Sequence, residues 1–196
     1  MPDPALDDPP AHRADLPFVL GGCVRGRPQP RSILSVGIVL AVIALPLRGL
    51  FLATGSSMEE GFMLAFPQRV LAGDVPNVDF LHLYGPFSLH VLAGWPWVFG
   101  DTLESQRVFG LLQHLGIIFA LFALARAWGR RTAVVSAVTV TLLVLTPIGL
   151  SALAWEGAVA LGLWSVVFGV RAMHTTGRTR RFALVSAGVL VGCALG

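Results

Sequence analysis

Two adjacent carboxylates, Glu59 and Glu60, follow an apolar stretch of the chain. A carboxylate beside apolar sequence is costly to bury unless it is hydrated or paired. Such a group can act as a general base that takes the proton of a hydroxyl group. The positive charge that would stabilise a departing phosphate is available from Arg48, Arg69 and Arg107, with a divalent metal as the alternative source.

Each of these residues also has a purely structural interpretation. Acids at the start of a helix suit its dipole, which is the alternative for Glu59 and Glu60. Arg48 lies about 15 residues into the first apolar stretch, where it either extends to the membrane interface or faces a lipid phosphate. Arg107 either starts the next apolar stretch or contributes to a site.

Two further acids are candidates for ligand binding. Asp79 either caps a loop or binds an acceptor, and its residue type does not separate the two roles. Glu156 is an isolated acid at the end of an apolar stretch, which favours a role in the site. His82 and His90 are metal-ligand candidates together with Asp79, although histidines at a membrane interface more often form simple hydrogen bonds.

The composition shows what must position these residues. The 196 residues are 55% hydrophobic and only 13% charged, where a soluble domain is about 25% charged. The mean hydropathy is +0.74. All fourteen basic residues are arginine and cluster between apolar runs, which is typical of cytoplasmic loops and not of nucleic-acid binding. The prediction is an all-α, polytopic transmembrane helical bundle in the lipid bilayer.

Five apolar stretches are predicted to be membrane spans. They cover about 33–54, 107–125, 132–150, 157–170 and 182–196. The segment from Pro86 to Gly100 is short for a span, which requires about 20 residues. We therefore expect it to be an interfacial helix in an outer loop, residues 55–106. A second interfacial helix, interrupted or bent at Pro67, is predicted before Gly73.

The arginines decide the orientation. If Pro86–Gly100 lies on the surface, the arginines of 126–131 and 171–181 are cytoplasmic and loop 55–106 is extracytoplasmic. If that segment spans, both clusters move outside, against the positive-inside rule. Residues 1–32 are predicted to be a disordered cytoplasmic tail. Residues 182–196 end without a polar flank, so we expect the chain to be truncated at its carboxy-terminus.

The motifs in the outer loop occur in a recognisable order. After Glu59-Glu60-Gly61 the chain reads L-A-G-D-V-P, D-F, Y-G-P and F-G-D-T-L-E-S-Q-R. This order resembles the amino-terminal part of GT-C-type glycosyltransferases, specifically the protein-mannosyltransferase and aminoarabinose-transferase group. In that family an acidic pair opens the first outer loop, and here Glu59 stands where Asp is commoner. The family's large carboxy-terminal domain has no counterpart in this sequence.

The resemblance implies a function. It implies transfer of a sugar from a polyprenyl-phosphate donor to an acceptor at the outer face of the plasma membrane. By the same resemblance Glu59 and Glu60 would be catalytic, with Glu59 as the base. Substrate binding would fall to the set Arg48, Asp79, Tyr84, Arg107 and Glu156. The alternatives from other classes are a transporter, which would need broken helices and an internal repeat that the sequence lacks, and a non-catalytic membrane scaffold.

Overall fold

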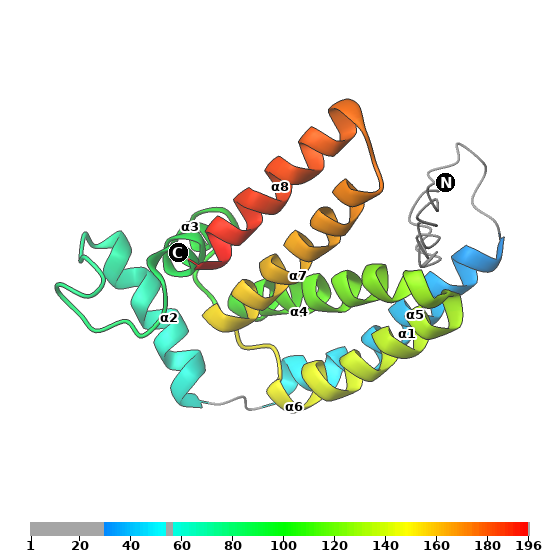
Figure 1. Ribbon diagram of the computed structural model, residues 1–196. Helices are drawn as coiled ribbons and strands as arrows, with labels where there is room; N and C mark the ends of the chain where they lie inside the picture. Colours follow the sequence, from blue (N-terminus) through cyan, green and yellow to red (C-terminus); the bar gives the residue numbers. More distant parts are fainter. Residues whose placement is uncertain (1–29, 54–56, 196) are drawn as a thin grey trace, which may run out of the picture.

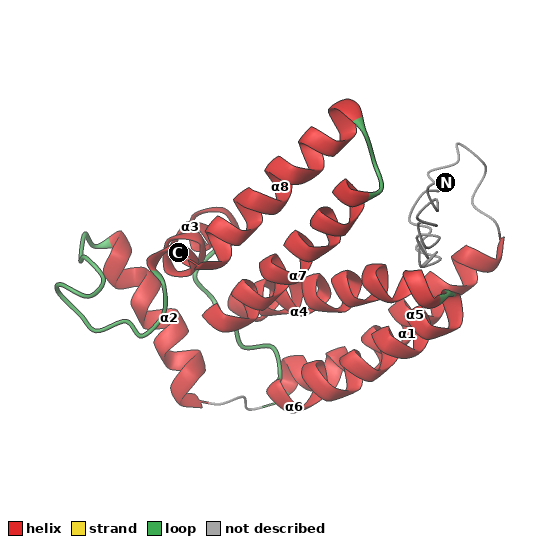
Figure 2. Ribbon diagram, in the orientation of Figure 1, coloured by secondary structure: helices red, strands yellow, loops and turns green. Residues whose placement is uncertain are grey.

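The computed structural model describes residues 30–53 and 57–195. Within these residues the chain forms helices and connecting loops and no strand (Figure 2). The predicted all-α class is therefore confirmed for the described part. The predicted disordered tail, residues 1–32, falls almost entirely outside it, and its last three residues belong to the first helix, which begins at Pro30.

Among the described residues, four helical segments are long and apolar enough to cross a membrane. They are Ile33–Leu52, Leu103–Trp128, Arg130–Ile148 and Ala154–Met173. They correspond to the first four predicted spans. The fifth predicted span lies in helix α8, Gly177–Leu195, which is not among the four because arginines occupy its first turns.

Two packed groups of helices make up the molecule (Figure 1). Helix α1, Pro30–Leu52, lies beside helix α5, Arg130–Val140, and α5 continues through a π-helical turn into the short helix α6, Thr146–Ile148. Helix α4, Leu103–Ala125, packs between this layer and the hairpin of α7, Ala154–Met173, with α8. Val39, Ile43, Ile118 and Leu145 form the apolar contact between the elements of the first layer and α4.

The segment 57–99 contains the two short helices that the sequence predicts. Helix α2, Ser57–Leu71, is continuous through Pro67, so of the two predicted possibilities, an interruption or a bend, the interruption is wrong. A single proline removes one hydrogen bond from a helix, and here the helix continues past it. Helix α3, Pro86–Phe99, has 14 residues and is about 21 Å long, shorter than the roughly 30 Å hydrocarbon core of a bilayer.

Two helix starts lie upstream of their predicted positions. Helix α4 begins at Leu103, where the hydroxyl of Thr102 accepts a hydrogen bond from the Ser105 amide at 3.1 Å. This is an ordinary N-cap. Helix α7 begins at Ala154, so Glu156 belongs to its first turn rather than to the preceding loop. The acid is therefore oriented by helix geometry.

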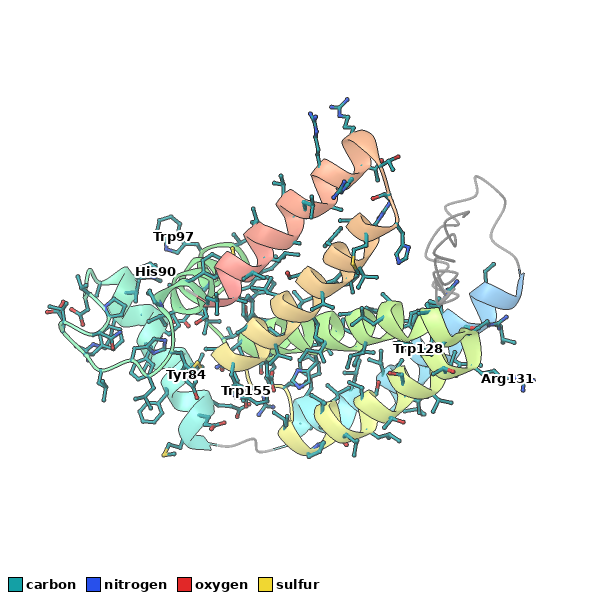
Figure 3. The ribbon with its side chains drawn as sticks, in the orientation of Figure 1. Tyr84, His90, Trp97, Trp128, Arg131 and Trp155 are labelled. Atoms are coloured by element: carbon teal, nitrogen blue, oxygen red, sulfur yellow. The ribbon has the colours of Figure 1, made fainter. Side chains whose placement is uncertain are left out.

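The segment that contains α2 and α3 and the two arginine-bearing turns lie toward different ends of the molecule. Figure 1 shows α2 and α3 at one end of the molecule, while the α4–α5 and α7–α8 turns lie toward the other. In Figure 3, Tyr84, Trp97 and Trp155 lie near the first end, and Trp128 and Arg131 lie at the opposite one. This arrangement is compatible with placing loop 55–106 and the arginine clusters on different sides of a membrane.

Candidate functional site

A buried ion pair between Glu60 and Arg107 ties the start of α2 to the start of α4. The guanidinium donates to both carboxylate oxygens, with Nε–Oε1 at 2.9 Å and Nη2–Oε2 at 3.0 Å. Both side chains are less than a tenth exposed. Two-point contacts of this kind add fixed geometry to charge attraction. Glu60 is consequently held by Arg107 and not presented to a ligand.

The same guanidinium caps the end of α1. Its Nη1 donates to the carbonyl oxygen of Phe51 at 2.5 Å, and its Nη2 donates to that of Ala53 at 2.9 Å. Carbonyls at the end of a helix have no partner within the helix, and Arg107 supplies one. Arg107, a predicted substrate-binding residue, thus has its donors engaged by the protein itself and joins α1, α2 and α4.

Glu59 faces a different environment from its neighbour. Adjacent helical residues point about 100° apart, and Glu59 lines a cavity of about 550 Å³ beside α2. We call this space the polar cavity, because Arg69, His82 and Tyr84 line it together with Glu59. Glu59, the acid predicted to be the base, therefore borders a space able to hold a ligand.

Aromatic rings form much of the remaining wall of the polar cavity. Phe62 and Phe66 stack at 5.3 Å between centroids, and Phe66 stacks on Phe80 at the same distance. The guanidinium of Arg69 lies 4.5 Å from the centroid of the Phe80 ring, within the range of a cation–π contact. The cavity thus combines a few polar groups with an apolar, aromatic lining, which is usual for small-molecule sites.

The loop after α2 is held by its own polar side chains. Asp79 accepts a hydrogen bond from the Val75 amide at 2.7 Å, and Arg69 pairs with Asp74 at 2.7 Å. Arg69 also donates to the carbonyl of Asp79 at 3.2 Å. Of the two roles left open for Asp79, the structure shows the loop-capping contact. Its exposed carboxylate is not part of the polar-cavity wall.

A second, larger space lies next to the polar cavity. It has a volume of about 670 Å³ and is bounded by α3, α4, α7 and the end of α8. We call it the apolar groove, since its wall includes Phe87, Phe109 and Trp164 and many small residues. Leu83 and Tyr84 line both spaces. Tyr84, a predicted substrate-binding residue, therefore stands where the two meet.

Glu156 lies against His114 in the contact between α4 and α7, without a hydrogen bond between the two side chains among the described residues. The His114 Nε2 atom lies 3.4 Å from Glu156 Oε1, and both side chains are 0% exposed. The other ring nitrogen of His114, Nδ1, is 2.8 Å from the carbonyl oxygen of Gly110. A carbonyl can only accept, so Nδ1 carries the proton. Glu156 is therefore buried, although it lies at the end of a predicted apolar stretch.

The three acids predicted to belong to the site, Glu59, Glu60 and Glu156, lie in three different environments. Of the three, only Glu59 lines the polar cavity, while Glu60 is bound by Arg107 and Glu156 is buried against His114. Glu59 nevertheless lies close enough to Glu156 for the two charges to interact. Arg48 is exposed on α1 and lines neither of the two spaces.

The described residues offer no ready metal site. No group of three or more His, Cys, Asp or Glu side chains among them is placed to hold an ion. His90 is 2.7 Å from the Pro86 carbonyl through Nδ1, and Asp79 is engaged by Val75. The alternative of a metal bound by His82, His90 and Asp79 is therefore not supported.

Several contacts of the site have no simple signal in the sequence. Gln68 donates to Asp101 at 2.5 Å and joins α2 to the start of α4. The Trp95 indole donates to the Ser105 hydroxyl at 3.0 Å and joins α3 to α4. The two residues of each pair are not separated in the sequence by a repeat of the helical period. Only the packing of α2 and α3 against α4 brings them together.

The chain was also compared with known proteins. No protein-family model, curated protein or solved structure matches it. Function is therefore inferred from the residues and their geometry.

Proposed function

We propose that the chain is a membrane glycosyltransferase, or the amino-terminal portion of one, that transfers a sugar from a polyprenyl-phosphate donor to an acceptor on the extracytoplasmic side. The observation that carries the proposal is that the polar cavity adjoins the apolar groove and shares Leu83 and Tyr84 with it. A lipid-linked sugar has a polar head and an apolar chain. The polar cavity suits the polar head, and the adjoining apolar groove suits the apolar chain.

The residues of the polar cavity supply the groups that the reaction needs. Glu59 is the general base that removes the acceptor proton as the hydroxyl attacks the sugar carbon. Arg69 stabilises the departing phosphate, because it lines the same cavity and positive charge stabilises that leaving group. Glu60 and Arg107 hold the first turn of α2, and with it Glu59, in place.

The proposed orientation follows from the arginines. A polytopic bundle with a cytoplasmic amino-terminus places the turns containing Arg126, Arg130 and Arg171 inside. The polar cavity then opens at the outer face of the plasma membrane, with α2 and α3 along its surface. A lipid-linked donor would reach this cavity from the bilayer, since the apolar groove borders α4 and α7, both of membrane-spanning length.

Sugar transfer by the full-length protein in lipid nanodiscs tests the proposal. A panel of undecaprenyl-phosphate sugars is offered with candidate acceptors, and the release of undecaprenyl phosphate is measured. Release that depends on Glu59 and persists after Glu104→Gln, a change to an exposed acid on α4, supports the proposal. If folded protein releases undecaprenyl phosphate from none of the donors, the proposal is contradicted.

A transporter is the second candidate, and one observation favours it. The buried His114–Glu156 pair lies on α4 and α7, both of membrane-spanning length, and ionisable pairs within spans often mark ion or proton pathways. A proton flux in proteoliposomes that is abolished by Glu156→Gln, without any sugar transfer, would favour this alternative.

A further inference from the structure

His82 is a buried histidine whose ring has no hydrogen-bond partner among the described residues. Its side chain borders the polar cavity, and the residue is only 4% exposed. Both ring nitrogens, Nδ1 and Nε2, lack a partner there. Buried polar atoms are almost always hydrogen-bonded, and an unpartnered one is costly. A ring in this state at the edge of a cavity is a candidate ligand contact.

The surroundings of His82 fix its position while leaving the nitrogens unpaired. Its backbone amide donates to the Asn77 side chain at 3.0 Å. Asn77 has the left-handed φ of 64°, which asparagine tolerates better than most residues. The imidazole meets Phe66 edge-on at 5.5 Å and Tyr84 at 5.8 Å. These contacts orient the ring without using its donor or its acceptor.

The charge state of His82 restricts what the ring can bind. Burial lowers the pKa of His82 from its usual value, so the ring is neutral near pH 7. A neutral imidazole has one N–H donor and one nitrogen acceptor. A hydroxyl group can satisfy either, whereas a phosphate or carboxylate anion offers acceptors alone. The other ionisable groups of the cavity are Glu59, Arg69 and Tyr84, and Arg69 is paired with Asp74.

We propose that His82 binds a sugar hydroxyl, and that the part of the polar cavity beside His82 holds a neutral sugar ring, while the phosphate of the lipid donor lies toward Arg69. This inference rests on the proposed function and names the ligand class of the same site. The aromatic wall supports it, because the electron-rich face of an exposed ring such as Phe62 attracts the C–H edges of a sugar. Glu59 supplies an acceptor for a second hydroxyl.

Substitutions at His82 separate hydrogen bonding from packing. His82→Phe keeps a flat ring and removes both nitrogens, while His82→Asn and His82→Gln each keep a donor and an acceptor. The matched control is His90→Phe, since His90 is exposed and lies on the neighbouring helix α3. Binding is measured in nanodiscs with methyl α-mannopyranoside, methyl β-glucopyranoside and inorganic phosphate as soluble probes. Undecaprenyl phosphate and undecaprenyl-phosphate mannose serve as lipid probes.

The expected result is a loss of sugar affinity without a loss of stability. His82→Phe should weaken binding of at least one soluble glycoside or of undecaprenyl-phosphate mannose about tenfold or more, and Asn or Gln should restore part of it. Its thermal midpoint should equal or exceed that of the wild type, because an unpartnered polar ring is replaced by an apolar one. A change limited to the soluble glycosides assigns the cavity to the acceptor, and a change limited to the lipid-linked sugar assigns it to the donor.

Other outcomes would overturn the inference. The inference fails if His82→Phe binds sugar as well as the wild type does, or if the wild type binds no sugar. It also fails if phosphate binding depends on His82 to the same degree. Sugar transfer with unchanged kcat and KM in His82→Phe would also remove His82 while leaving the transferase intact. Conversely, sugar binding that depends on His82 in a protein that transfers nothing would keep this inference and refute the proposed function.

Discussion

Glu59 and Glu60 are neighbours in the chain with opposite environments. Glu60 is 7% exposed and bound to Arg107, while Glu59 is partly exposed and lines the polar cavity. The difference follows from the roughly 100° rotation between adjacent residues of α2. The same substitution, Glu to Gln, therefore has different expected consequences at the two positions.

At Glu59 the expected consequence is lost turnover. If Glu59 is the base, Glu59→Gln should lower kcat about a hundred- to ten-thousand-fold and leave the thermal midpoint and donor affinity near those of the wild type. Turnover of undecaprenyl-phosphate sugars and thermal unfolding in nanodiscs measure these quantities. Full activity of this variant would remove Glu59 from the mechanism.

At Glu60 the expected consequence is lost stability. Glu60→Gln removes the charge that Arg107 faces and leaves a buried guanidinium without its counterion, which typically costs about 3–5 kcal/mol. Thermal unfolding should show a clearly lower midpoint than in Glu59→Gln or in Glu104→Gln, whose acid is exposed. An unchanged midpoint in Glu60→Gln would show that the ion pair contributes little to folding.

At His82 the structure predicts an acid-sensitive contribution to stability. Burial lowers the pKa of His82, so the folded state binds this proton less readily than the unfolded chain, whose histidine titrates near pH 6.5. The free energy of unfolding should therefore be unaffected above about pH 6.5 and should decrease as the pH falls from there toward the lower folded-state pKa. The thermal midpoints of wild type and His82→Phe at pH 7.5 and 5.5 measure this. An equal decrease in both proteins would assign the acid sensitivity to other groups.

At the scale of elements, glycines set how closely the 149–153 loop approaches α4. A Cβ atom at Gly110 would overlap the backbone carbonyl of Leu150. The same loop leads into α7 and positions Glu156 against His114. A close backbone approach of this kind admits only glycine, because the obstructing atoms belong to a main chain that cannot rotate away.

Gly110→Ala tests this packing. The added methyl group should separate the loop from α4 and lower the stability by about 1–3 kcal/mol, the usual cost of overpacking. The control is Gly169→Ala on α7, where a Cβ meets nothing within 4 Å and alanine should be neutral or slightly stabilising. Thermal unfolding of the two variants measures the difference. Equal midpoints would mean that the loop adjusts without cost.

At the scale of the whole molecule, the question is which end faces which side of the membrane. The acidic loop and the arginine-bearing turns lie toward opposite ends of the structure (Figure 1). Four segments have the length and composition of membrane spans. The positive-inside rule then predicts that the polar cavity faces the extracytoplasmic side.

Cysteine labelling tests this orientation in intact cells. After the native Cys23 and Cys193 are replaced, a membrane-impermeant maleimide added from outside should label Val78→Cys in the loop after α2. It should not label Trp128→Cys in the turn after α4. Both positions are highly exposed, at 79% and 74%, so exposure does not separate them. Labelling of position 128 from outside, with none at position 78, would reverse the model.

The sequence by itself determined the helical class, the approximate spans and the two short helices before α4. Apolar runs of about 20 residues have few alternatives to a helix in lipid, because every backbone group must be paired within the segment. Local signals also located the end of α2, where Gly73 has a φ of 99°. These features depend on residues close together in the chain, so composition and spacing were enough.

Only the tertiary structure decided the roles of the individual polar residues. Glu59, Glu60 and Glu156 are the same residue type. The first two lie on α2 and the third on α7, and Arg107 and His114 both lie on α4. Whether each carboxylate meets a cavity, Arg107 or His114 depends on how these helices rotate and pack. The unpartnered ring of His82 likewise results from the contacts of Phe66 and Tyr84 around it. Side-chain surroundings are set by long-range packing, which no local pattern encodes.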